Sequence, residues 1–234
     1  MNYYPICLDI TDRHCIVIGG GKVAARKAQG LLDHQARVTI ISPELGAESA
    51  ALNAADQLIW LNRPYQEGDL QGAFLVIAAT DDPKVQERIH AEAEENNILL
   101  NVADVPKWCN FILPATVRRG DLSLSISTGG KSPAMAKRMR REMEKQFGPE
   151  YEILLETLGA LRPLVLDLQL PHADNKRIFE QLLHDDMVIW IRANQWDKVF
   201  NHFQNILGDQ VPLDSLAAIQ AQCAHHSAGS IDYE

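Results

Sequence analysis

Short apolar runs alternate with helical patterns over the first hundred residues, and this alternation is the strongest constraint on the fold. The runs that read as buried strands are residues 15–18, 38–41, 58–61, 74–79 and 98–102. Helical patterns cover residues 23–34 and 83–95, the second with a proline in its first turn. Strands that alternate with helices predict an α/β domain in which a parallel sheet carries helices on both faces.

A glycine-rich turn directly follows the first predicted strand. Residues 19–24 fit the pattern G-x-G-x-x-A, in which glycines let the backbone approach a pyrophosphate and the first helical amides stabilise its charge. A purely structural glycine turn is the alternative, but a position between a strand and a helix favours binding. We therefore expect an NAD-binding Rossmann domain whose cofactor contacts include Gly19, Gly20, Gly21, Lys22, Val23 and Ala24.

The second predicted strand runs into Ser42, Pro43 and Glu44, so the acidic residue that usually ends this strand is displaced. We expect these three residues to contact the adenosine ribose. The carboxylate of Glu44 would repel the 2′-phosphate of NADP, which favours NAD. Thr80, which ends the fourth strand, is another expected contact, although the aspartates after it could equally cap the next helix.

Asp104 follows the fifth predicted strand, where Asn101 and Val102 complete the expected cofactor contacts. The apolar strand and Pro106 should partly desolvate the carboxylate, which suits it to accept a proton. A turn-forming aspartate is the alternative, and by spacing alone it is the more common one.

The pattern changes after residue 104. Residues 111–117 read as another strand, and residues 122–126 alternate leucine or isoleucine with serine, as a half-buried strand does. Ser132 and Pro133 then suit the start of a helix that carries Met135, Met139 and Met143 at every fourth position. An edge strand and an apolar stripe both need to be covered, so this segment is expected to form a homodimer interface.

Three domains are expected. Residues 1–113 form the Rossmann domain, residues 114–149 the dimerisation and substrate-cleft segment, and residues 150–234 a small all-helical domain. The tail holds Cys223, His225 and His226, which could bind a metal, although a frayed tail is the more common outcome.

Positive charge is concentrated in one part of an acidic chain. Residues 114–145 contain eight basic and three acidic residues, while the whole chain has a net charge of -9. This balance argues against a nucleic-acid binder and favours an anionic small molecule or an acidic partner, with a solvated helix face as the plain alternative. No apolar run is long enough for a membrane span, and four scattered cysteines fit a reducing compartment, so a cytoplasmic location is expected.

Four segments in order, GGGKVAARKA, AATDD, NVADVPKWCNFILPA and SISTGGKSPAMAKRMRREME, resemble the first module of siroheme synthase and its stand-alone relatives. These relatives form the precorrin-2 dehydrogenase and sirohydrochlorin ferrochelatase family. The resemblance covers residues 1 to about 150. It implies a Rossmann domain, a dimerisation segment and a helical domain. It also implies NAD-dependent oxidation of precorrin-2 to sirohydrochlorin, in some members followed by insertion of Fe2+ as a substrate.

By motif matching, Asp104 would be the catalytic carboxylate and a transient metal ligand, with no metal stably bound. The resemblance places the pairs 22–23 and 43–44 at NAD. The loop that would border the tetrapyrrole consists of Thr128, Gly129, Gly130, Lys131, Ser132 and Pro133. A tetrapyrrole with several carboxylates would suit the basic segment.

A regulatory protein that senses NAD without catalysis is the alternative function. It would bind NAD through the Rossmann half and a partner through the basic helical half. Asp104 argues weakly against it, because a sensor has no need for a carboxylate at the cofactor edge.

Overall fold

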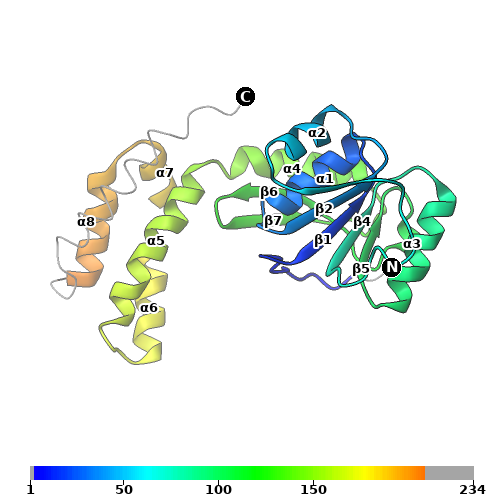
Figure 1. Ribbon diagram of the computed structural model, residues 1–234. Helices are drawn as coiled ribbons and strands as arrows, with labels where there is room; N and C mark the ends of the chain where they lie inside the picture. Colours follow the sequence, from blue (N-terminus) through cyan, green and yellow to red (C-terminus); the bar gives the residue numbers. More distant parts are fainter. Residues whose placement is uncertain (1–2, 209–234) are drawn as a thin grey trace. The chain divides into compact units, whose positions relative to one another are not determined.

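The computed structural model describes residues 3–208 (Figure 1). The chain divides into two compact units, Met1–Leu113 and Pro114–Glu234. Residues 114–149 and the helices after them belong to the same unit, so the further boundary expected at residue 149 stays a prediction. The cysteine and two histidines expected in the tail lie outside the described residues.

The first unit is built on a five-stranded parallel sheet with the order β3-β2-β1-β4-β5. The strands are β1 (His14–Ile18), β2 (Arg37–Ser42), β3 (Ile59–Asn62), β4 (Leu75–Ala78) and β5 (Leu99–Val102). Their apolar residues are almost completely buried in β1, β2 and β4, as expected for the middle of a sheet covered on both faces. The predicted parallel sheet is confirmed.

Helices cover both faces of this sheet (Figure 1). They are α1 (Lys22–Leu32), α2 (Ala47–Ala54) and α3 (Pro83–Glu95). The inner face of α1 packs Ala24, Ala28 and Leu31 into one core cluster, and α3 contributes Ile89 and Ala93 to the cluster on the opposite face. The sequence patterns predict α1 and α3 closely, whereas α2 has no counterpart among them.

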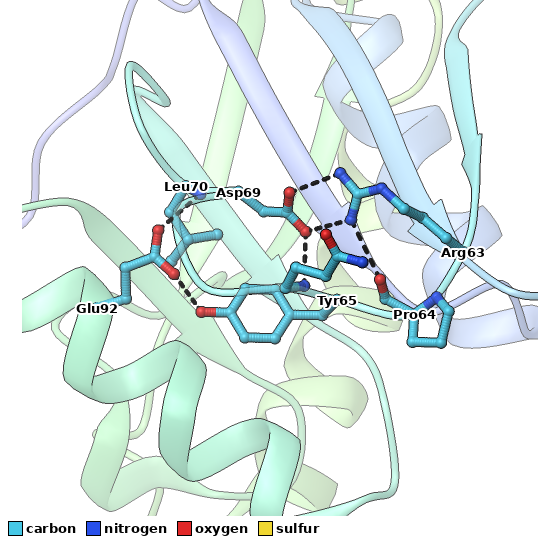
Figure 2. Close-up of polar contacts among 7 residues, drawn as sticks. Arg63, Pro64, Tyr65, Asp69, Leu70 and Glu92 are labelled. Atoms are coloured by element: carbon cyan, nitrogen blue, oxygen red, sulfur yellow. Dashed lines mark hydrogen bonds and ion pairs between the residues drawn. The ribbon is translucent and has the colours of Figure 1, made fainter.

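The segment between β3 and β4 is fastened to α3 by a buried carboxylate (Figure 2). Glu92 is 8% exposed, accepts the backbone N–H of Leu70 at 2.9 Å and accepts the hydroxyl of Tyr65. Burial and the bond to Glu92 raise the pKa of Tyr65. In the same segment, the guanidinium of Arg63 makes two bonds of 2.7 Å to the carboxylate of Asp69, so the first part of the connection is also closed on itself.

The second unit starts with an antiparallel hairpin of β6 (Ala115–Arg119) and β7 (Leu122–Ile126). β6 begins four residues later than the expected strand of residues 111–117. In β7 the serines are exposed and the apolar residues half-buried, as the alternation predicts. The helix α4 (Pro133–Gln146) follows, and its methionines at positions 135 and 139 are 55% and 37% exposed.

Four further helices follow in the described part of this unit, up to residue 208, which agrees with the predicted helical region. They are α5 (Glu150–Leu166), α6 (His172–Leu182), α7 (Met187–Arg192) and α8 (Trp196–Leu207). Their core contains Leu161, Val165, Leu182 and Phe203, and an ion pair between buried Glu150 and Arg192 joins α5 to α7. Among residues 3–208, no helix is long and apolar enough to cross a membrane.

Candidate functional site

The carboxyl ends of β1 and β4 meet at the point where the order of the sheet reverses, which is where open α/β sheets bind ligands. The turn after β1 fits against the end of β4. Gly19 has φ +119°, and a Cβ there would lie 2.4 Å from the carbonyl oxygen of Ala79. A Cβ at Gly20 would lie 2.0 Å from the carbonyl oxygen of Glu44. The first two glycines are therefore required by the packing of the protein itself.

Gly21 differs from its two neighbours. It is exposed, a Cβ there would meet nothing within 4 Å, and as the N-cap of α1 it makes no side-chain capping bond. An uncapped helix start beside a glycine is a ready anion site, because its amides point outward and the helix dipole favours negative charge. Lys22 and Val23 are exposed beside it, whereas Ala24 is fully buried and lets α1 pack closely on the sheet.

The loop after β2 lies against this turn. The amide of Gly46 donates to the carbonyl of Gly20 at 2.9 Å, and the hydroxyl of Ser42 donates to the carbonyl of Glu44 at 2.6 Å. Ser42 is 6% exposed, so its hydroxyl shapes the loop, while Pro43 and Glu44 are exposed.

Sequence reasoning missed two residues at the start of α2. Gly46 is its N-cap, and the carboxylate of Glu48 in its first turn lies 4.0 Å from the ammonium of Lys22. The glycine directly before an alanine-rich stretch was the available signal for the helix start.

The structure at the end of β4 shows whether the aspartates after Thr80 cap the next helix. Asp82 caps α3, because its carboxylate accepts the amides of Lys84 at 2.9 Å and of Val85 at 3.4 Å. Thr80 lies just before it, half-buried, and its carbonyl accepts the side-chain amide of Gln86 at 2.7 Å. The capping function therefore belongs to Asp82, and Thr80 remains at the edge of the sheet where a cofactor contact is expected.

Asp104 lies in a tight turn after β5. The amide of Val105 donates to the carbonyl of Val102 at 3.3 Å, and Asp104 has φ +61°. This left-handed conformation is uncommon outside glycine, although aspartate adopts it more readily than most residues. Asp104 is exposed, so the expected desolvation of its carboxylate is wrong, because the chain leaves the sheet before this residue.

Asn101 and Val102 support this turn from within the protein. The side-chain amide of Asn101 donates to the carbonyl of Phe111 at 3.1 Å, and Val102 is 2% exposed. The amide of Val102 donates to the thiol of Cys109 at 3.2 Å. The polar groups of both residues are thus engaged by the segment that follows Asp104.

That segment returns to the outer side of β5 at Asn110. Its backbone N–H donates to the carbonyl of Leu100 at 3.1 Å, and its side-chain oxygen accepts the amide of Leu100 at 2.8 Å. The side-chain amide also donates to the carbonyl of Ile98 at 2.8 Å. A single asparagine therefore pairs with β5 as a short neighbouring strand would.

Lys27 of α1 is a further polar residue near Asp104 that the sequence reasoning missed. It is half-buried, and burial together with Arg26 lowers its pKa, while the carboxylate of Asp104 opposes this shift. Its spacing was the available signal, since it lies three residues after Ala24 and four before Leu31, on the inner face of the helix.

The loop expected to border the substrate lies in the second unit. Thr128 accepts the amide of Lys131 through its carbonyl and the amide of Ser132 through its hydroxyl, both at 3.1 Å. The hydroxyl of Ser132 accepts the amide of Met135 at 3.2 Å and so caps α4. Gly129 and Gly130 have positive φ, and both are exposed together with Lys131 and Pro133.

In the part of the chain that the structure describes, no group of three or more histidine, cysteine or acidic residues is arranged to hold a metal ion.

Two family models match the chain. Residues 6–115 match a family model for NAD(P)-binding domains. Residues 119–146 match a family model for the central part of sirohaem biosynthesis proteins. The siroheme synthase of Thioalkalivibrio sulfidiphilus is 36% identical over 184 residues, which are 78% of this chain and 37% of that protein. That of Escherichia coli O1:K1 / APEC is 33% identical over 214 residues, 92% of this chain and 47% of that protein. The chain spans less than half the length of these curated relatives.

A solved structure of SirC, precorrin-2 dehydrogenase, superposes with a TM-score of 0.74 at 28% identity, over 87% of this chain and 98% of that chain. The predicted Rossmann fold and the prediction of an NAD-type cofactor are confirmed by these matches. The chain is therefore homologous to the siroheme synthases, as its motifs indicate, with an NAD(P)-binding domain in residues 6–115 and a sirohaem biosynthesis central segment in residues 119–146.

Proposed function

We propose that this protein is an NAD-dependent dehydrogenase that oxidises precorrin-2 to sirohydrochlorin in siroheme biosynthesis. The observation that carries the proposal is the open, uncapped start of α1 at Gly21, on the same edge of the sheet as the exposed Asp104. One feature suits a dinucleotide and the other suits proton transfer. The similarity to SirC, precorrin-2 dehydrogenase, supports the choice of substrate.

The residues at the glycine turn fit NAD. The free space at Gly21 accommodates a pyrophosphate, and the first-turn amides of α1 would hold it. Glu44 is exposed after β2, and Glu48 follows in the first turn of α2. Two carboxylates at the ribose end disfavour the 2′-phosphate of NADP, so NAD is the proposed cofactor.

Bound NAD supplies a hydride acceptor. Asp104 would take the proton that leaves as the saturated carbon of precorrin-2 loses its hydride, which makes Asp104 the general base. The basic segment of residues 114–145 and the loop of residues 128–133 would receive the carboxylates of the tetrapyrrole, because positive charge concentrates an anionic substrate.

The test is to compare the wild type with Asp104→Ala in the presence of precorrin-2 and NAD. Wild-type protein should produce the absorbance of sirohydrochlorin, and the variant should be slower by about 10² to 10⁴-fold with nearly unchanged NAD affinity. Asp82→Ala removes a carboxylate that caps α3 and serves as the control for a lost charge. Normal turnover in Asp104→Ala would reduce Asp104 to a turn residue. NAD binding without any turnover in the wild type would favour the sensor.

Insertion of Fe2+ into sirohydrochlorin is a second proposed activity, which the names of the siroheme synthase relatives support. Fe2+ is then a substrate, and Asp104 would accept pyrrole N–H protons or guide the cation. Purified sirohydrochlorin with Fe2+ and no NAD tests this step alone. If wild type and Asp104→Ala insert iron equally fast, the two reactions depend on different groups.

A further inference from the structure

The turn of residues 102–105, which carries Asp104, has few backbone hydrogen bonds of its own to hold it. Its one closing bond, from the amide of Val105 to the carbonyl of Val102, is 3.3 Å long, and Asp104 has φ +61°. A side chain in this conformation is strained, and it persists where surrounding groups enforce it. The structure therefore needs another element to fix the turn.

The thiol of Cys109 contacts both ends of this turn. Its sulfur accepts the amide of Val102 at 3.2 Å. Its Sγ lies 3.3 Å from the carbonyl oxygen of Val102 and 3.5 Å from that of Val105, and the single thiol proton can be donated to either of them. A hydrogen-bonding side chain that joins the first and the last residue of a turn restricts the residues between them, one of which is Asp104.

The surroundings of Cys109 are themselves held in place. The side-chain amide of Asn101 lies 3.7 Å from its sulfur and donates to the carbonyl of Phe111. Lys27 of α1 lies close enough to the turn for the Asp104 carboxylate to oppose the lowering of the Lys27 pKa. Groups from α1, from β5 and from the segment after Asp104 thus converge on one turn.

We propose that Cys109 is a positioning residue for Asp104: its thiol fixes the turn of residues 102–105 and thereby the place from which the carboxylate acts. The inference rests on the proposed function of Asp104 as proton acceptor. Cys109 itself takes no part in the reaction.

The test compares Cys109→Ala with Cys109→Ser. Alanine removes every bond to the turn, and a misplacement of about 1 Å in a catalytic group costs about 10²-fold, so kcat should fall by about 10 to 10²-fold. The KM for precorrin-2 and the Kd for NAD should stay near their wild-type values, because the glycine turn and the loop of residues 128–133 are untouched. Serine can accept and donate as the thiol does, and should restore kcat to within about threefold.

Two further measurements separate positioning from general loss of structure. Hydrogen exchange at the amide of Val102, which donates to the sulfur, should quicken in Cys109→Ala and slow again in Cys109→Ser. Cys15→Ala is the matched control, because Cys15 is fully buried in β1 and its loss should lower Tm with kcat unchanged.

The outcomes that overturn the inference are distinct from those that overturn the proposed function. Normal kcat in Cys109→Ala, together with an inactive Asp104→Ala, would refute the function of Cys109 alone. Equal losses in the alanine and serine variants, in step with Tm, would show a merely structural cysteine. Normal turnover in Asp104→Ala would refute the proposed function of Asp104 and this inference with it.

Discussion

Gly20 and Gly21 differ in what surrounds their Cα atoms, although they are neighbours in one turn. A side chain at Gly20 would collide with the carbonyl of Glu44, whereas a side chain at Gly21 would enter open space. Sequence patterns treat both as glycines of one motif. The structure assigns the first to packing and leaves the second free for a ligand.

The Gly21→Asp variant should stay folded and lose NAD binding. Aspartate is a preferred N-cap residue, so the variant should be at least as stable as the wild type. Its free energy of unfolding should be higher by at most about a few tenths of a kcal/mol. Its carboxylate would occupy the pyrophosphate position and repel it. Calorimetry with NAD and thermal unfolding measure the two effects, and native NAD affinity in this variant would contradict the assignment.

Gly20→Ala is the opposite case and serves as the control. The collision with the Glu44 backbone should destabilise the protein by about 1 to 3 kcal/mol, the range of overpacked sites. An unchanged Tm in this variant would show that the loop after β2 moves aside easily.

At the scale of elements, the sequence predicts the strands and helices that have strong periodicity and capping residues. Asp82 and Pro83 mark the start of α3, and the apolar runs mark all five strands of the sheet. α2 escaped prediction because its alanine-rich sequence has no apolar stripe, and Ser49 is its one buried residue. β6 begins late because the backbone before it is held by Asn101 through Phe111, a contact between distant residues that no local pattern contains.

In the candidate site, too, local sequence patterns predict some features and miss others. The glycine turn and Asp104 were predicted from local motifs, because a turn and a strand end are local structures. Cys109 and Lys27 were not, since their importance depends on where the segment after β5 and the helix α1 meet. The exposure of Asp104 was also beyond local reasoning.

The attachment of the β3–β4 connection to α3 should contribute strongly to stability. Tyr65→Phe removes one bond to buried Glu92 and should cost about 1 to 2 kcal/mol. Glu94→Gln, on the exposed side of the same helix, should stay within about 0.5 kcal/mol. Urea unfolding measures both, and equal stabilities of the two variants would show that the Tyr65 bond contributes nothing net.

His14 should make the stability of the sheet depend on pH. Its imidazole lies 3.0 Å from the hydroxyl of Thr39, and burial and Arg37 lower its pKa below the usual 6.5. The unfolded chain therefore binds a proton at higher pH than the folded chain does. The stabilisation is present above about 6.5, the unfolded value, and is lost as the pH falls through the lower folded value.

Thermal unfolding of wild type and His14→Gln between pH 8 and pH 5 measures this contribution. Glutamine can still bond to Thr39 but does not titrate, so the variant should lose less stability on acidification. Parallel curves for the two proteins would exclude His14 as a source of the pH dependence.

At the scale of the whole molecule, we propose that the protein is a homodimer. Met135 and Met139 leave apolar surface exposed on α4, and β6 and β7 form a sheet of two strands in which the serines of β7 are exposed. Apolar stripes and strand edges of this kind are normally covered. A second copy of the chain is the proposed partner.

Met139→Glu should dissociate the dimer, because it would bury a charge in the interface. Light scattering at micromolar concentration should give the mass of two chains for the wild type and of one for the variant. Lys137→Glu, at an exposed position of the same helix, is the charge control and should remain dimeric. A monomeric wild type would refute the proposal.

The asparagine beside β5 also has a consequence for solubility. β5 is the last strand of the sheet, and an open edge strand can recruit strands from other chains into aggregates. Asn110 occupies the hydrogen-bonding groups of Leu100 and the carbonyl of Ile98, so extension of the sheet at this edge is blocked. The loop that contains Asp104 therefore also hinders self-association at the edge of the sheet. Selection against aggregation would preserve the conformation of this loop even where catalysis is not required.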